Sequence, residues 1–488
     1  MARSYYIRTF GCQMNEHDSG RIAALLDEEG MVPSADPEAA DVIVLNTCCI
    51  RENADQKLYG HLGHLKTLKD RRPDLQIAVG GCLAQKDRDA IQQKAPWVDA
   101  VWGTHNISRA PALLDRARST RQPAFEVLDG AGDDGAEFPT ALPIRRDAGW
   151  AAWVTIQIGC DNHCAFCIVP SVRGPEASRP FGQLVAEVAE LAAAGTVEVT
   201  LLGQNVNSYG RDLTTRLRSD PDWRRAADLA GPAWAAAEAP RARPLFADLL
   251  RAVGELEGIR RVRFTSPHPK DLRPETIASM AEVPAVCPHL HLPLQSGSDR
   301  ILAAMHRGYT SARYLDRLAA TRRGVEDLAV TTDIIVGFPG ETEADFERTL
   351  EVAAEARYDS AYTFIYSPRP GTEAAAWTDR FVAADVVAAR FERLRVVVER
   401  SALARHEARV GRVEEVLFEG PSKRDPAMAS GRTAQNKLVH VPAPPGALPA
   451  GTWADVRITG AAPHFLRGEL VEVTARPSHR TRIPVVAG

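Results

Sequence analysis

Short apolar segments alternate with helix-like segments along most of the chain, and this alternation limits the folds that the chain can adopt. In the first part, the expected strands are residues 4–10, 41–46 and 76–79, and the expected helices are 18–29 and 52–70. Strands that alternate with helices at this spacing indicate a parallel sheet covered by helices. We therefore expect an N-terminal α/β domain over residues 3–120, followed by a polar linker over 121–145.

A cysteine lies just beyond each of these three strands, at Cys12, Cys48 and Cys82. The carboxyl ends of parallel strands share one edge of the sheet, where ligands bind, so the three thiols can meet there. Three unrelated buried cysteines would fit the same pattern, because free cysteine is often buried. Cys49 competes with Cys48, but continued strand alternation would turn its side chain to the other face. We therefore favour Cys48.

A second series of strand-like segments begins after the linker. Its members are Val154–Ile158, Val197–Leu202, Arg261–Thr265, His289–Leu292, Ala329–Val336 and Ala361–Ile365. Six parallel strands separated by helices predict a partial (β/α)6 barrel over residues 146–402, with its chemistry at the carboxyl ends of the strands. Residues 211–244 interrupt the series, are rich in Ala and Arg, and are expected to form an insertion on the rim.

Three cysteines stand close together at the end of the first strand of this series. Cys160, Cys164 and Cys167 have the spacing C-x3-C-x2-C, which lets three thiolates turn toward one point. A structural zinc ion prefers four ligands, whereas a four-iron cluster bound by three thiolates keeps one iron open for a small molecule. The alternatives are a zinc site with a distant fourth ligand, or three buried cysteines. Cys287 has no cysteine near it in the sequence and is expected in the core.

Other expected strands of this series also end in polar residues. The segments are Gly203–Asn207, Thr265–His268, Gln295–Ser298 and Gly337–Glu341. Their amide and hydroxyl groups could hydrogen-bond a cofactor at the mouth of the barrel, although Gly, Pro, Asn and Ser also suit ordinary turns. Their repetition on one rim favours a binding site.

Composition and charge narrow the class of protein. The formal net charge of −4 gives no general affinity for nucleic acid, and eight cysteines in 488 residues are too few for a disulfide scaffold. The start of the chain lacks a secretory signal, and no apolar run is long enough for a membrane span, so we expect a cytoplasmic protein. Residues 403–475 alternate like a small β-barrel with more basic than acidic side chains. Such barrels often bind RNA, although a solvated basic face would look the same.

Several longer motifs go beyond these local patterns. They are Thr9–Asn15, Leu45–Glu52, Gly80–Gln85, Arg173–Arg179, Leu202–Tyr209 and Tyr366–Thr372. With these motifs the chain resembles, over nearly its whole length, the methylthiotransferases of the radical S-adenosylmethionine (SAM) superfamily. The resemblance implies an N-terminal methylthiotransferase domain, a radical SAM core and a C-terminal TRAM domain. It is strongest for the branch that acts on isopentenylated adenosine in tRNA.

The resemblance also implies cofactors and their ligands. Cys160, Cys164 and Cys167 would hold the 4Fe-4S cluster that cleaves SAM, and Cys12, Cys48 and Cys82 would hold a second 4Fe-4S cluster with an open iron. The residues expected to contact SAM are Phe166, Gln204, Asn205, Ser296 and Gly337. Two SAM molecules would serve as methyl donor and radical source.

The reaction implied is the addition of a methylthio group to C-2 of N(6)-isopentenyladenosine beside the anticodon. The partners implied are the tRNA anticodon stem-loop and an electron donor such as flavodoxin or ferredoxin, and the protein is expected to be a monomer. One alternative is the same chemistry on threonylcarbamoyl-adenosine or on a ribosomal-protein aspartate. Another is a non-catalytic, metal-containing RNA-binding protein.

Overall fold

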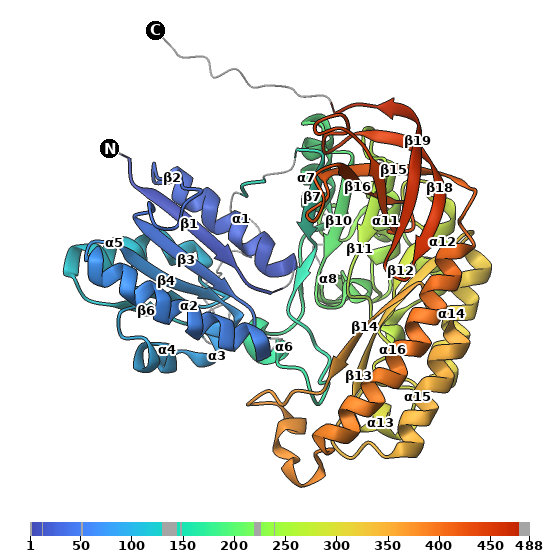
Figure 1. Cartoon of the computed structure of the whole chain (residues 1–488), viewed down its shortest axis with the longest axis horizontal. Helices are drawn as coiled ribbons and strands as arrows, with labels where there is room; N and C mark the ends of the chain where they lie inside the picture. Colours follow the sequence, from blue (N-terminus) through green and yellow to red (C-terminus); the bar gives the residue numbers. More distant parts are fainter. Residues whose placement is uncertain are drawn as a thin grey trace.

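The computed structural model describes residues 2–11, 13–49, 52–128, 144–146, 149–218, 226–238 and 240–477, with backbone only for 52–56. Three parts are visible in Figure 1: an N-terminal α/β domain, a central α/β core and a small C-terminal β-barrel. Helix α6 (Val169–Arg173) lies between the first two parts. Within the described residues, no helix has the length and apolar character needed to cross a membrane.

The N-terminal sheet has six parallel strands in the order β2-β1-β3-β4-β5-β6. The strands are β1 (Ser4–Thr9), β2 (Val32–Pro33), β3 (Val42–Thr47), β4 (Gln76–Gly81), β5 (Ala100–Trp102) and β6 (Ala124–Glu126). The three predicted strands are therefore present. The other three have only two or three residues each, too few to show a periodic pattern. The sheet continues to Glu126, which lies inside the segment expected to be a linker.

Helices cover both faces of this sheet. Val42 and Val44 pack against α1 (Gln13–Glu28) and α5 (Ala110–Thr120), while Ile43 and Leu45 pack against α2 (Glu52–Arg71), α3 (Cys82–Asp87) and α4 (Asp89–Lys94). Strands buried on both faces read as continuous apolar runs, as the sequence showed. Helix α1 begins five residues before the predicted start, because its first turns bury the polar Asn15, His17 and Asp18. Apolar periodicity cannot mark such turns.

The central core contains all six predicted strands, but hydrogen bonding divides them into two parallel sheets. One sheet contains β7 (Ala151–Thr155), β10 (Glu198–Leu202) and β11 (Arg261–Phe264), and the other contains β12 (His289–His291), β13 (Ala329–Val336) and β14 (Ser360–Ile365). An isolated parallel bridge between Val262 and Val286 joins them. Pro284 and Pro288 flank Val286 and lack the N–H group that a continuous ladder requires.

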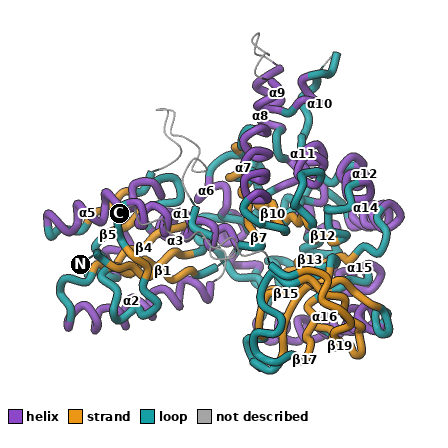
Figure 2. The backbone as a smooth tube through the Cα atoms, turned by 90° about the horizontal axis from the view of Figure 1, so that it is seen from above, coloured by secondary structure: helices purple, strands orange, loops and turns teal. Residues whose placement is uncertain are grey.

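Helices cover the outer face of these strands. The longer ones are α7 (Phe181–Ala193), α11 (Phe246–Gly254), α12 (Pro274–Glu282), α14 (Ser311–Gly324), α15 (Glu343–Ala356) and α16 (Ala384–Glu407). Their apolar side chains join those of the strands in one large core. The insertion forms α8 (Arg211–Arg218), α9 (Ala226–Ala230) and α10 (Pro232–Ala235), and Figure 2 shows α9 and α10 projecting from the core on the side away from the barrel.

The C-terminal barrel is closed in the order β15-β16-β17-β19-β18. Its strands are β15 (Val413–Pro421), β16 (Met428–Thr433), β17 (Leu438–Pro442), β18 (Trp453–Ala462) and β19 (Phe465–Ala475). The barrel docks at the amino ends of the core strands. Arg263 donates to the carbonyls of Thr433 and Ala434, and Lys437 pairs with Asp359 at 2.6 Å. The barrel therefore lies at the opposite end of these strands from the Cys160–Cys167 loop.

One histidine at the junction of α16 and the barrel makes stability depend on pH. The Nδ1–H of buried His406 donates to the Ala462 carbonyl at 2.6 Å, and burial lowers the pKa of His406 from 6.5 to about 4. The unfolded chain therefore binds this proton at a higher pH than the folded chain does. We expect the contribution of neutral His406 to the free energy of unfolding to be complete above about pH 6.5. This contribution should fall as the pH drops toward about 4. Urea unfolding should show a smaller loss on acidification in His406→Gln than in the wild type; equal losses would contradict this.

Candidate active site

The Cys160–Cys167 loop is fixed at its base by a short antiparallel pair of strands. β8 (Gln157–Ile158) pairs with β9 (Ala177–Ser178), so the predicted strand Val154–Ile158 is in fact interrupted after Thr155. Gly159 lies between β8 and the loop with φ of 76°, and a Cβ there would stand 1.9 Å from the Pro175 carbonyl oxygen. Only glycine fits this position. The N–H of Cys160 donates to the Gly174 carbonyl, which closes the loop.

The three thiols of this loop line one cavity of about 230 Å³. Burial raises the pKa of Cys160 to about 11 and that of Cys167 to about 12, so these two thiols are protonated when bare and a bound metal would have to displace their protons. Among the described residues, no three His, Cys, Asp or Glu side chains are grouped closely enough to hold one metal ion. A four-iron cluster places each thiolate on a different iron and does not need that closeness. Three thiols that line one cavity therefore fit a 4Fe-4S cluster.

Cys82 lines the same cavity from the N-terminal domain, together with Gln13 and Met14 of α1. Cys12 lies outside the described residues, but its neighbour Gly11 packs against Cys48, where a Cβ on Gly11 would stand 2.1 Å from the Cys48 Cβ. The order β2-β1-β3 reverses between β1 and β3, and ligands of such sheets bind at this switch point. The carboxyl ends of β1, β3 and β4 thus bring these segments toward the Cys160–Cys167 loop.

The orientation expected for Cys49 is wrong. Its thiol hydrogen-bonds with that of Cys82, and this contact, followed by burial, raises the pKa of Cys49. Strand β3 ends at Thr47, so strand alternation does not extend to Cys48 and Cys49. Both cysteines are buried, and Cys49 is the one in contact with Cys82.

The residues expected to contact SAM differ in their surroundings. Gln204 lines the cavity, and its Oε1 is buried without a hydrogen-bond partner. The amide of Asn205 donates to Asp271 at 3.0 Å and to Glu176 at 3.2 Å, and Phe166 packs edge-on against Phe338. Of these three, only Gln204 lines the cavity; the Oδ1 of Asn205 is also buried without a hydrogen-bond partner, but Asn205 is not a lining residue.

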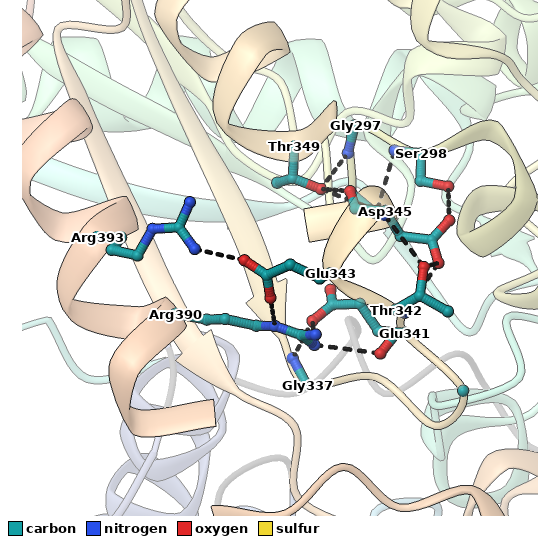
Figure 3. Close-up of polar contacts among 12 residues, drawn as sticks. Gly297, Ser298, Gly337, Glu341, Thr342, Glu343, Asp345, Thr349, Arg390 and Arg393 are labelled. Carbon is teal, nitrogen blue, oxygen red and sulfur yellow. Dashed lines mark hydrogen bonds and ion pairs between the residues drawn. The ribbon is translucent and has the colours of Figure 1, made fainter. Parts of the chain in front are cut away.

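Ser296 and Gly337 belong to two loops that an extended hydrogen-bond network holds in place. The Gly337 N–H donates to Glu341, which Arg390 of α16 contacts at 2.9 Å. Thr349 of α15 accepts from the Gly297 N–H at 3.0 Å and lies 3.3 Å from the Ser296 hydroxyl. Figure 3 shows how these contacts tie both loops to α15 and α16. Neither Ser296 nor Gly337 lines the cavity of about 230 Å³, so their contact with SAM stays a prediction.

His268, which the sequence marked only as part of a polar strand end, is a further cavity residue. Its Nδ1 accepts from the Lys270 N–H at 3.2 Å, so Nε2 carries the ring proton, and this Nε2 is buried without a partner. Burial lowers the pKa of His268 to about 2, which keeps the ring neutral. Buried polar atoms normally find partners. The unpaired His268 Nε2 and Gln204 Oε1 therefore fit a cofactor or substrate with complementary polar groups.

A buried ion pair joins the two domains beside the cavity. Asp18 of α1 accepts from Arg173 of α6 at 2.8 Å and lies 3.5 Å from Arg21. All three side chains are buried. Arg173 follows the Cys160–Cys167 loop closely in sequence, so this pair fixes the loop relative to the N-terminal domain. Contacts across such a distance in sequence are not readable from local patterns.

Comparison with known proteins agrees with this architecture. Residues 4–103 match a family described as "Uncharacterized protein family UPF0004", residues 154–353 match the Radical SAM superfamily, and residues 407–471 match the TRAM domain. The tRNA-2-methylthio-N(6)-dimethylallyladenosine synthase 1 of Mycobacterium marinum is 50% identical over 100% of this chain and 90% of its own. The chain belongs to this synthase family.

A second relative supports the same assignment. The tRNA-2-methylthio-N(6)-dimethylallyladenosine synthase of Nocardia farcinica is also 50% identical, over 99% of this chain and 91% of its own. Among solved structures, the radical SAM methyltransferase TsrM of Kitasatospora setae matches with a TM-score of 0.50 and 13% identity over 77% of each chain, which shows a shared fold. Membership of the radical SAM superfamily implies a 4Fe-4S cluster and SAM as cofactors of this synthase.

Proposed function

We propose that the chain adds a methylthio group to C-2 of N(6)-isopentenyladenosine in tRNA, using two 4Fe-4S clusters and two SAM molecules. The observation that carries the proposal is the single cavity lined by Cys160, Cys164 and Cys167 on one side and Cys82 on the other. A site that must both activate a carbon and deliver sulfur to it needs two such centres within reach of one base. Cys12 and Cys48 are proposed to complete the second cluster with Cys82.

The cluster bound by Cys160, Cys164 and Cys167 would supply the electron that converts SAM into a carbon radical strong enough to activate an aromatic C–H bond. The residues of the chain would hold the cluster, orient the bound molecules and enclose them. The β8–β9 pair fixes the cysteine loop, while Gln204 and His268 offer an acceptor and a donor to bound polar groups. Asp18 and Arg173 keep the two domains at a fixed separation.

The substrate base has to leave its stack to enter this cavity, as bases do in other enzymes that modify them. Because the barrel docks at the far end of the core strands, the RNA must extend from the barrel along the side of the core. A larger cavity of about 670 Å³ lies on this side, lined by Tyr5 and His17 of the N-terminal domain, Trp153 of β7 and Glu419 of the barrel. We propose that the anticodon stem-loop follows this side and that a flavodoxin- or ferredoxin-type protein supplies electrons to the monomeric enzyme.

Nucleoside analysis of tRNA from a deletion strain tests the proposed acceptor. We expect 2-methylthio-isopentenyladenosine to disappear and isopentenyladenosine to accumulate. The wild-type gene should restore the modification, and a Cys164→Ala copy should not. Unchanged 2-methylthio-isopentenyladenosine in the deletion strain would exclude this acceptor and direct attention to threonylcarbamoyl-adenosine or a ribosomal-protein aspartate.

A further inference from the structure

Arg307 is a buried cation at the edge of the cavity, just beyond α13 (Asp299–Ala304). Its side chain is 6% exposed. Nη1–H donates to the Cys164 sulfur at 3.3 Å, and Nε–H donates to the Tyr309 hydroxyl at 3.2 Å. The guanidinium is therefore directed at one of the three thiols of the Cys160–Cys167 loop.

Arg307 is exceptional among the buried arginines that the structure describes, because it alone has no carboxylate oxygen within 4.0 Å. The others pair with Asp or Glu: Arg21 and Arg173 with Asp18, Arg179 with Glu187, Arg261 with Glu198 and Glu415, Arg263 with Glu198, Arg390 with Glu341, and Arg409 with Glu414. A buried charge without a counter-charge is strongly destabilising. The hydrogen-bond partners of Arg307 are the Tyr309 hydroxyl and the Cys164 thiol, and the thiol can become an anion by binding metal.

Tyr309 holds the guanidinium in this position. Its hydroxyl lies 2.9 Å from the Leu294 carbonyl and 3.0 Å from the Pro293 carbonyl, and its ring centroid lies 5.5 Å from the Arg307 Cζ. The neighbouring His268 ring is neutral and adds no competing charge. The direction of Arg307 toward Cys164 is thus fixed by the surrounding structure.

We propose that Arg307 pairs with the Cys164 thiolate and so raises the reduction potential of the cluster that cleaves SAM. The inference rests on the proposed function only in that Cys164 is taken as a ligand of this cluster. One-electron reduction, by an external low-potential reductant, adds one negative charge to the cluster. A fixed positive charge and a hydrogen bond at a ligand sulfur stabilise that reduced form relative to the oxidised form. Arg307 is therefore a positioning and tuning residue for electron entry.

The test is an EPR-monitored redox titration of the full chain loaded with clusters, without RNA, first without and then with SAM. The EPR signal that changes when SAM is added identifies the cluster concerned. For Arg307→Gln we expect the ratio of reduced to oxidised cluster, measured at the wild-type midpoint, to fall about tenfold, which is a shift of about 59 mV to more negative potential. Arg307→Lys keeps the charge and should shift the midpoint less than half as far.

A matched control removes the same charge from a solvent-exposed position. Arg300, seven residues earlier, is 57% exposed and pairs with Asp345, so Arg300→Gln should leave the midpoint unchanged because water screens its charge. An unchanged midpoint in Arg307→Gln, or equal shifts in the Gln and Lys variants, would overturn the proposal. A shift that occurs only with SAM present would also overturn it, because Arg307 would then act on SAM.

Iron content is measured before the titration so that every outcome is decisive. If Arg307→Gln folds but loses the iron of this cluster while Arg307→Lys retains it, charge pairing with Cys164 is supported. If Arg307→Lys also loses it, the proposal fails. A wild-type protein that binds no cluster would instead contradict the proposed function, which keeps the two failures distinct.

Discussion

Replacing Cys48 with alanine should remove about four of about eight irons per chain and abolish methylthio transfer, while release of 5′-deoxyadenosine from SAM continues. The two processes separate because the Cys160–Cys167 loop is held by its own β8–β9 pair and by the Gly174 carbonyl, which do not depend on Cys48. After anaerobic reconstitution, iron and sulfide analysis measures the cluster content. Chromatography of the nucleosides measures methylthio transfer and the release of 5′-deoxyadenosine.

Cys49→Ala is the matched control, since the two neighbouring cysteines are equally buried. We expect this variant to keep about eight irons and its transfer activity. The comparison matters because Cys49 hydrogen-bonds with Cys82. Iron loss in Cys49→Ala with full iron in Cys48→Ala would assign the ligand to Cys49. Loss of all iron in Cys48→Ala would mean that this cysteine is structural.

Asp18→Asn should destabilise the protein by about 3–5 kcal/mol, the usual cost of leaving a buried charge unpaired. Asp18 is the carboxylate shared by Arg173 and Arg21, and two nitrogens of Arg21 are already buried without a partner. Arg173→Gln should lower the free energy of unfolding less, because Asp18 remains paired with Arg21 in that variant. Urea unfolding measures both effects, and the loss of domain alignment should lower transfer more than SAM cleavage.

Asp27→Asn is the control for this pair. Asp27 also belongs to α1 and pairs with an arginine, Arg145, but both side chains are 37% exposed, so the loss should be about 1 kcal/mol or less. Equal destabilisation by Asp18→Asn and Asp27→Asn would contradict a special role for the buried pair. A larger loss in Arg173→Gln than in Asp18→Asn would contradict the sharing of Asp18.

The parallel sheets and the cysteine loops were predictable because each depends on residues close together in the sequence. Buried strands such as β3 and β13 give continuous or alternating apolar runs, and Cys82 and Cys160 follow their strands directly. Cys49 shows the limit of this reasoning. Alternation stops where the strand stops, at Thr47, so it does not give the side-chain directions of Cys48 and Cys49.

The contacts that complete the site join distant segments, and no local pattern records them. Asp18 and Arg173 are 155 residues apart, and Arg307 reaches Cys164 across 143 residues. The docking of the barrel at the amino ends of the core strands likewise depends on pairs such as Lys437 with Asp359. In the sequence, such charged side chains cannot be distinguished from ordinary surface residues, because only the fold shows that they are buried.

The central claim is that two iron–sulfur centres act on one base held in one cavity. The most direct measurement incubates the reconstituted protein anaerobically with SAM, a low-potential reductant and an isopentenylated tRNA, and determines the mass of the target nucleoside. We predict the mass of 2-methylthio-isopentenyladenosine together with release of 5′-deoxyadenosine. Release of 5′-deoxyadenosine with the target nucleoside unchanged, from protein that carries both clusters, would contradict the account.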